Sequence, residues 1–125
     1  MAKIQVPRDC GNAPRKLFLI DFNTALANGD NDFFQELISE KISWDIVGQW
    51  PITDKADFLK AVKSLALWKV KELVVETIIT HGYEASVSGQ VVAKDKSVYR
   101  FCHIYRFTRA SGITISALTT FVVKL

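Results

Sequence analysis

The chain has 125 residues and a formal net charge of +3, and its composition is 49% hydrophobic and 23% charged. These values predict one soluble globular domain that buries roughly two-thirds of the surface of its unfolded chain. No apolar run approaches the roughly 18–20 residues of a membrane span, and the charge is too small and too little clustered for a nucleic-acid-binding protein.

The beginning of the chain differs in character from the rest. We expect residues 1–13 to form a flexible N-terminal arm and residues 14–125 to form the domain. The stretch MAKIQVPRDCGNAPRK lacks the apolar core of a signal peptide. The two cysteines, Cys10 and Cys102, suggest no disulfide framework, which fits a reducing compartment. The sequence therefore predicts a cytoplasmic protein.

Three helices are predicted from apolar residues at helical spacing. The first covers residues 14–30, where Pro14 suits the first turn and Gly29 suits the position just after the last turn. The second covers residues 29–39 and the third covers residues 54–66, and each follows residues that can cap a helix.

The strands are rich in Val, Ile, Thr and aromatic residues and are separated by short turns. A first strand is predicted over residues 41–48, and four longer ones over residues 69–80, 83–93, 97–109 and 113–125. Long strands joined by short turns indicate an antiparallel meander, and helices followed by a sheet indicate the α+β class. Because long meander strands twist and curl readily, such a sheet can enclose a cavity against the helices.

The strand VYRFCHIYRF, residues 98–107, contains the first candidate for a functional residue. Alternation places His103 on the face opposite Cys102, in a row with the rings of Tyr99, Phe101, Tyr105 and Phe107. One interpretation is a buried neutral histidine with a local hydrogen bond. The other is the polar floor of a pocket, because small-molecule sites combine apolar walls with a few convergent polar groups.

Asp45 in the strand ISWDIVG is the second candidate. Alternation places Trp44 on one face of this strand and Asp45 on the other. Asp45 can be an exposed or helix-capping carboxylate. Alternatively, it projects into the cavity, where poor solvation raises its pKa and makes it available as a base.

Motifs for cofactors and metals are missing from the sequence. It contains no G-x-G-x-x-G, phosphate-binding loop, G-x-S-x-G or H-E-x-x-H. Cys102 and His103 point to opposite faces of a strand, so they cannot hold a metal ion together without a bulge. His81 lies in a turn far from any second obvious ligand. We therefore expect neither a metal ion nor a cofactor.

The order of several short motifs resembles a known group of proteins. The chain has a helix ending in ALANGD, then FFQELIS, ISWDIVG, and finally YRFCHIYRFT and GITISALTTF. This order resembles the nuclear transport factor 2-like superfamily, and more narrowly its SnoaL-like and ketosteroid isomerase-like proteins, over residues 14–125. The resemblance implies a cone-shaped α+β fold, with three N-terminal helices packed in a strongly bent mixed or antiparallel sheet that encloses an apolar pocket. It also implies a homodimer formed through the sheet.

The resemblance assigns roles to three positions. Asp45 matches the aspartate of the family's D-P-V-G motif, which is the general base of ketosteroid isomerases. His103 stands where these relatives have a second, protonated aspartate in a pattern like I-D-x-M-R-F. Phe22 stands where they have the oxyanion-hole tyrosine, so one donor is lost, and a loss of this kind typically costs about 2.7–4 kcal/mol in the transition state.

Three functional hypotheses follow from these residues. In the first, the chain is a cofactor-free isomerase or cyclase in which Asp45 takes a proton beside a carbonyl and His103 donates to the enolate oxygen. A small apolar substrate would then contact Phe22, Trp44, Phe101, Tyr105, Thr119 and Phe121. In the second, the protein binds a ligand or a partner without catalysis, as the missing tyrosine suggests. The third, an epoxide hydrolase, ranks lower because it needs more polar residues around a water than Asp45 and His103.

Overall fold

The computed structural model describes residues 2–6, 14–65 and 70–125. Part of the predicted arm, the end of the predicted third helix and the start of the predicted strand over residues 69–80 lie outside these ranges. The elements, in chain order, are β1 (Lys3–Gln5), α1 (Pro14–Asn28), α2 (Asn31–Phe34), β2 (Ile38–Ile46), α3 (Lys55–Leu65), β3 (Val70–His81), β4 (Glu84–Ala93), β5 (Val98–Phe107) and β6 (Ile115–Lys124).

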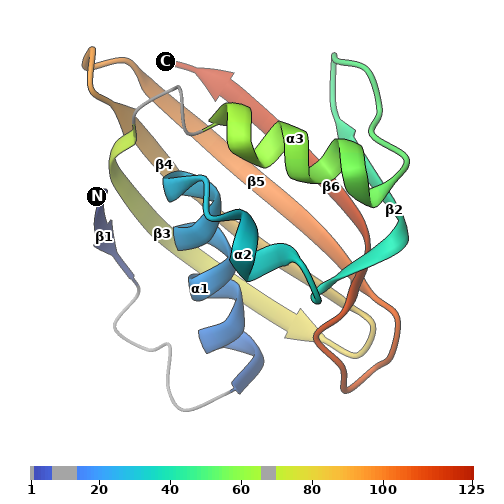
Figure 1. The fold of residues 1–125 in the computed structure, drawn as a ribbon. Helices are drawn as coiled ribbons and strands as arrows, with labels where there is room; N and C mark the ends of the chain where they lie inside the picture. Colours follow the sequence, from blue (N-terminus) through green and yellow to red (C-terminus); the bar gives the residue numbers. More distant parts are fainter. Residues whose placement is uncertain (1, 7–13, 66–69) are drawn as a thin grey trace.

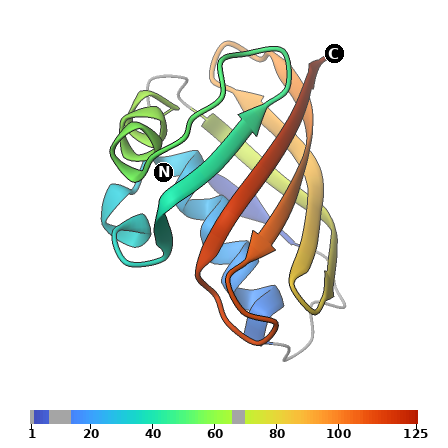
Figure 2. The same ribbon diagram turned by 90° about the vertical axis from the view of Figure 1, so that its right-hand side faces the viewer.

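The strands form one six-stranded sheet in the order β1-β3-β4-β5-β6-β2. Strands β3 to β6 pair antiparallel, whereas β1 joins β3 and β2 joins β6 in parallel. Figure 1 shows the helices on one face of the sheet, and Figure 2 shows the sheet curling around them. The predicted α+β class is therefore confirmed, although α3 follows β2 and the helices do not form one N-terminal group.

The end of α1 and the start of α2 follow from local capping. Gly29 takes a φ of 66°, a left-handed conformation that glycine adopts without strain. Its N–H donates to the carbonyl oxygen of Leu26 and that of Asp30 donates to Ala25, which closes the last turn of α1. The Asp30 carboxylate then accepts a hydrogen bond of 3.4 Å from the backbone N–H of Phe33 and caps α2.

Helix α2 is much shorter than the helix predicted over residues 29–39. It ends at Phe34, and β2 begins at Ile38, ahead of the predicted start at residue 41. Ile38 pairs with Ile115 of β6, and the N–H of Ile115 donates to the carbonyl oxygen of Leu37. Sheet pairing therefore replaces further helical turns, because tertiary contacts override a weak local preference.

Residues 3–5 of the predicted flexible arm form a strand. This strand, β1, pairs in parallel with residues 72–74 of β3. The Lys3 ammonium lies 3.8 Å from the Glu72 carboxylate, and Ile4 packs against the hydrophobic core. Strand pairing therefore fixes this part of the arm, which is too short to show a recognisable alternation in the sequence.

Gly89 in the middle of β4 lies where the neighbouring strands approach closely. A Cβ atom at this position would overlap the carbonyl oxygen of Val74 on β3 and lie 3.0 Å from the Phe101 ring on β5. Beside it, the pairing of β3 with β4 shifts between Val75 and Thr77, and such a bulge increases the local twist. The missing Cβ and the bulge together allow the strands to bend around the helices.

Aromatic rings from the helices pack against rings from the sheet. The buried ring of Phe22 on α1 lies 5.0 Å from that of Phe34 on α2 and 5.1 Å from that of Tyr105 on β5. Trp44 of β2 lies 4.9 Å from Phe58 of α3. Ring pairs of this kind add about 0.5–1.5 kcal/mol each beyond the burial of their surface. The cluster therefore holds all three helices against one face of the sheet.

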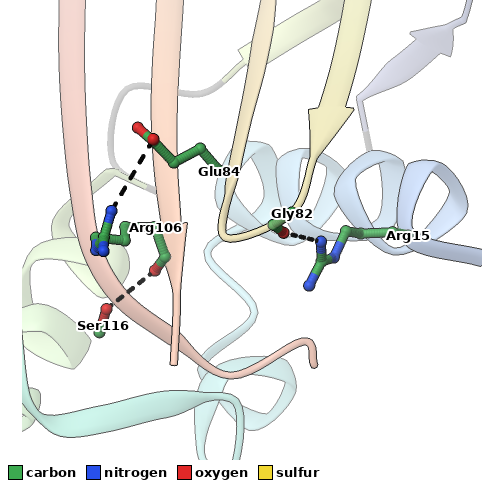
Figure 3. A network of polar contacts seen from close by, with 5 residues as sticks. All are labelled: Arg15, Gly82, Glu84, Arg106 and Ser116. Atoms are coloured by element: carbon green, nitrogen blue, oxygen red, sulfur yellow. Dashed lines mark hydrogen bonds and ion pairs between the residues drawn. The ribbon is translucent and has the colours of Figure 1, made fainter. Parts of the chain in front are cut away.

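Arg15, in the first turn of α1, ties the helix to two turns of the sheet. Its guanidinium donates to the backbone carbonyl oxygens of Gly82, Arg109 and Gly112, and Figure 3 shows the contact with Gly82. It also lies over the ring of Phe107, 4.1 Å from the centroid. A guanidinium with several donors in a fixed plane suits this task, because it reaches several carbonyl groups at once.

Exposed polar contacts lie at the same end of the sheet. The Arg106 guanidinium is 4.0 Å from the Glu84 carboxylate, and Ser116 Oγ donates to the Arg106 carbonyl oxygen over 3.2 Å (Figure 3). Exposed ion pairs typically contribute between zero and about 1 kcal/mol. Arg15, with its four hydrogen bonds, is therefore the main polar tie at this end.

Candidate ligand cavity

A cavity of about 370 Å³ lies between α1 and the concave face of the sheet. This volume is near the lower end of the range of roughly 300–1,000 Å³ that small-molecule sites occupy. Exposed Gln49 and Lys124 line it at the end where β6 finishes. Most of the wall is apolar and includes Leu26, Leu73, Val91, Phe101 and Val122.

Three polar residues are buried in the described part of the chain, and all three line this cavity. Asn23 of α1, His103 of β5 and Thr120 of β6 are 3%, 7% and 3% exposed. Burying a polar group costs free energy unless it is hydrogen-bonded. The hydrogen bonds of these three residues therefore determine which buried polar atoms the cavity offers to a ligand.

Thr120 connects Trp44 and His103 through two hydrogen bonds. Its hydroxyl oxygen lies 2.9 Å from Nε1 of Trp44 and 2.7 Å from Nδ1 of His103. The arrangement follows from the sheet, since His103 and Thr120 are directly paired on β5 and β6, and Trp44 comes from neighbouring β2. The three strands thus place an indole and an imidazole within hydrogen-bonding distance of the same hydroxyl.

Burial lowers the pKa of His103 from its ordinary value of 6.5 to about 4. The physical cause is desolvation, because a charged imidazolium loses its water in this apolar setting. The imidazole is therefore neutral at neutral pH. Thr120 accounts for one of its ring nitrogens, and no described residue forms a hydrogen bond with the other, Nε2.

Asn23 is held by two hydrogen bonds from its amide nitrogen. Nδ2 donates to the carbonyl oxygen of Leu19 and to the hydroxyl oxygen of Tyr105, both over 2.9 Å. Burial raises the pKa of Tyr105, so its phenol stays protonated. Both of these hydrogen bonds use Nδ2, and no described residue donates to Asn23 Oδ1, so this oxygen is an unused acceptor of a residue that lines the cavity.

Five of the residues predicted for the site lie on the inner side of the sheet. Trp44, Phe101 and His103 line the cavity. Phe22 and Tyr105 are fully buried in the core next to it, where their rings pack against each other instead of forming the wall. Tyr105 still affects the cavity, because it orients the amide of Asn23.

Asp45 lies on the exposed face of the sheet and does not line the cavity. It follows Trp44 in β2, and successive side chains of a strand point to opposite faces. Because the indole of Trp44 faces the cavity, the carboxylate of Asp45 points away from it. The structure therefore does not bring Asp45 and His103 together.

Thr119 and Phe121 also lie outside the cavity, which corrects their predicted position in the wall. The expected alternation from Ile115 is interrupted by a bulge, since the pairing of β5 with β6 shifts between Arg106 and Phe107. An extra residue in one strand moves every following side chain to the other face. The neighbouring residues Thr120 and Val122 therefore line the wall, and Phe121 is 44% exposed.

Asn23 and Thr120 are the functional candidates that sequence reasoning missed. Asn23 had a detectable signal, because it lies one helical turn after buried Leu19 and one turn before buried Leu26. A polar residue within an apolar helix stripe is unusual and needs a partner. Thr120 had no such signal, because the bulge that turns it inward is not visible in the residue pattern.

Two further features of the described residues concern metal ions and membranes. Among the described residues, no group of three or more His, Cys, Asp or Glu side chains is placed to hold a metal ion. None of the helices in those residues is both long enough and apolar enough to cross a membrane.

No protein-family model and no curated protein matches the chain, whereas many solved structures do. An NTF2-like protein of unknown function from Cytophaga hutchinsonii is 18% identical, with a TM-score of 0.65 over 86% of this chain and 97% of that one. SalBIII, an epoxide hydrolase/cyclase-like enzyme with a role in pyran ring formation in polyether salinomycin, is 13% identical, with a TM-score of 0.65 over 87% and 90%. A de novo designed protein with a curved β-sheet is 12% identical, with a TM-score of 0.74 over 90% and 88%.

These likenesses concern the fold. At such low identities the comparisons confirm the predicted resemblance to nuclear transport factor 2-like proteins at the level of architecture. A designed protein has the same architecture, and one fold supports many unrelated functions. The fold alone therefore does not determine the function of this chain, and the residues of its cavity carry the specific information.

Proposed function

We propose that this chain, which has the fold of nuclear transport factor 2-like proteins, binds a small apolar molecule that carries a hydrogen-bonding oxygen. The observation that carries the proposal is the gathering of all three buried polar residues of the described chain around one cavity with mostly apolar walls. A core without a ligand would be more stable with apolar side chains at these positions, because each incompletely bonded polar group costs about 1–3 kcal/mol.

The geometry favours binding over proton transfer. Abstraction of a proton beside a carbonyl needs a base within hydrogen-bond reach of that proton. No described residue that lines the cavity is a carboxylate, and Asp45 faces outward. Nδ1 of His103 already lies 2.7 Å from the Thr120 hydroxyl. Non-catalytic ligand binding is therefore the function that we infer.

A second candidate is catalysis in which His103 activates an oxygen of the substrate. This role is supported by the neutral imidazole, which can donate a hydrogen bond to a carbonyl or epoxide oxygen. The architecture shared with the epoxide hydrolase/cyclase-like enzyme SalBIII is compatible with such chemistry. The water or base that completes the reaction would have to come with the substrate or from solvent, since the described lining provides no carboxylate.

Binding is tested with cyclodecanone and cyclodecane, which share one ring size and differ by a carbonyl oxygen. The unfolding temperature of the full chain should rise with cyclodecanone and rise less with cyclodecane. A ligand present at one hundred times its dissociation constant adds about 2.7 kcal/mol to the free energy of unfolding. In His103→Phe the advantage of the ketone should disappear, whereas Asp45→Asn should behave as the unchanged protein. Equal shifts for both compounds in the unchanged protein would contradict the proposal.

Catalysis is tested separately by exchange of the protons beside the carbonyl of cyclodecanone in deuterated buffer, followed by NMR. If the protein only binds the ketone, these protons should exchange as slowly with the unchanged protein or Asp45→Asn as they do in buffer without protein. Exchange well above the buffer rate that His103→Phe abolishes would replace the binding hypothesis with the catalytic one.

We propose that the outer face of the sheet binds a second copy of the chain and so forms a homodimer. On this face Ile104 and Phe121 are 41% and 44% exposed. Cys102 is paired with Phe121, and Ile104 is paired with Thr119, so these side chains form one continuous surface over β5 and β6. Sedimentation equilibrium should give twice the mass of one chain, and Phe121→Glu should give the single mass, with the exposed substitution Lys63→Glu as the control.

A further inference from the structure

We propose that Trp44 and Thr120 are positioning residues that fix the tautomer of His103, so that its Nε2–H is always the donor offered to the cavity. The ligand would then be a molecule whose apolar body carries an acceptor oxygen of the ketone, ester, ether or epoxide type. The part concerning the ligand rests on the proposed function, whereas the part concerning the tautomer stands without it.

The direction of the hydrogen bonds follows from Trp44. An indole nitrogen can only donate, so the Thr120 oxygen, 2.9 Å away, must accept from it. Trp44 is buried and packed against Phe58, so the indole has little freedom to turn away. One lone pair of the Thr120 oxygen is therefore already used by Trp44.

The hydroxyl proton of Thr120 determines what happens at His103. Among the described residues, Nδ1 of His103 is the one atom within hydrogen-bonding distance that can accept this proton. If Nδ1 carried a proton instead, two donors would point at the same oxygen and the hydroxyl proton would have no partner. A buried donor without a partner costs about 1–3 kcal/mol. Thr120 therefore donates to Nδ1, and the imidazole proton resides on Nε2.

The second ring nitrogen is the one that the cavity can use. His103 lines the cavity. Its Nε2 atom has no hydrogen-bond partner among the described residues and is not completely buried by them. A neutral imidazole with Nδ1 occupied can donate from Nε2 but cannot accept there. The opposite wall carries the complementary group, because Asn23 has used its amide hydrogens and keeps Oδ1 as an acceptor.

Fixed donors and acceptors make the cavity selective. A site built to hydrogen-bond a substrate group discriminates against analogues that lack it, because its own polar atom is then left unpaired. The Nε2–H donor should favour a ketone over the hydrocarbon of the same shape. A primary ammonium group cannot accept from this donor and would bury a charge among apolar walls, so cyclodecylamine should bind more weakly than cyclodecanone.

The tautomer is tested by NMR of the full chain labelled with 15N-histidine, without any ligand. The unchanged protein should show His103 with a protonated Nε2 and an unprotonated Nδ1. In Thr120→Val the hydroxyl is lost, and a population with protonated Nδ1 should appear. Thr120→Ser keeps a hydroxyl and should restore the original pattern. Exposed His81 provides an internal reference signal.

The role of Trp44 is tested in the same way with Trp44→Phe, which removes the indole donor and keeps a ring. The Thr120 hydroxyl then keeps Nδ1 as its acceptor but loses the donor that fixes its orientation, so the second tautomer should become populated less than in Thr120→Val. Thr119→Val, one residue away on the outer face, is the matched control and should leave His103 unchanged. A protonated Nδ1 in the unchanged protein, or an unaltered tautomer in both Thr120→Val and Trp44→Phe, would overturn the proposal.

The ligand arm compares cyclodecanone, cyclodecane and cyclodecylamine by titration. Thr120→Val should weaken cyclodecanone binding in proportion to the fraction of His103 whose proton has moved from Nε2 to Nδ1, and should weaken cyclodecane binding less. Equal weakening of both compounds would overturn the selectivity. If none of the three binds to the unchanged protein, the proposed function fails, while the NMR result still decides the tautomer.

Discussion

His103 stays uncharged at neutral pH for two reasons that act together. Burial removes the water that would stabilise an imidazolium, and the hydroxyl of Thr120 lies 2.7 Å from Nδ1, where a second ring proton would have to be added. Both effects oppose protonation of the folded protein. The unfolded chain has neither constraint, so the two states differ in how tightly they bind a proton.

This difference predicts that acid weakens folding through His103. Its pKa is about 4 in the folded protein against 6.5 without burial, so between these values the unfolded chain binds a proton that the folded chain does not. Stability is full above about pH 6.5 and falls as the pH approaches 4, by about 3 kcal/mol over the whole interval. Urea unfolding at several pH values measures the effect in the unchanged protein and in His103→Phe. The stability difference between the two should shift by this amount, and parallel curves would contradict the lowered pKa.

At the scale of single elements, alternation succeeds until a strand becomes irregular. It correctly places Trp44, Phe101 and His103 toward the helices. It fails for Thr119 and Phe121, because a bulge in the pairing of β5 with β6 reverses the faces. Bulges depend on the partner strand and on the bend of the sheet, and neither can be read from ten residues of one strand.

The same strand pattern shows why Asp45 could not share a cavity with Trp44. Neighbouring residues of a regular strand point to opposite faces, so a prediction that places both in one wall needs an irregularity between them. The pairing of β2 with β6 is regular from Ser43 to Ile46. The family resemblance supplied the role of Asp45, whereas the residue pattern already placed it on the other face.

Gly89 provides a prediction about the bend of β4. Gly89→Ala places a methyl group against the Val74 carbonyl oxygen and the Phe101 ring, and overpacking of this kind typically costs about 1–3 kcal/mol. Because Phe101 lines the cavity, ligand affinity should fall as well. Urea unfolding measures the first effect and ligand titration the second. Ser88→Ala, on the opposite face of the same strand, should change neither, and a fully stable Gly89→Ala would show that the strand can bend without the glycine.

For the whole molecule, the order of elements predicts the architecture well. Helical spacing, the long β-rich segments and their short turns indicate a meander packed on helices, and this arrangement is present. Long-range pairings are what the pattern cannot supply. Both parallel additions, β1 to β3 and β2 to β6, join segments that are far apart in the chain.

Arg15 provides the prediction at this scale. Arg15→Ala removes hydrogen bonds from a charged group to three carbonyl oxygens in two separate turns. Bonds to charged groups contribute about 1.5–3 kcal/mol each when well formed, and because this side chain is half-buried we expect a total loss of about 2–4 kcal/mol. Arg15→Lys should recover part of it, since an ammonium cannot span all three carbonyl oxygens. Lys16→Ala is the control, and equal stability of Arg15→Ala and Lys16→Ala in urea would contradict this role.

The position of Arg15 also predicts that the two ends of the sheet open locally at different rates. Its guanidinium holds the turns at Gly82 and at Arg109–Gly112, while the cavity extends toward Lys124 and Tyr99 at the other end of the same strands. Local opening occurs in cooperative units of unequal stability. Amide protons near Gly82 should therefore exchange slowly whether or not a ligand is bound. Those of Val91, Tyr99 and Val122 should slow down only when the cavity is occupied, so hydrogen exchange would give a map of occupancy that needs no knowledge of the ligand.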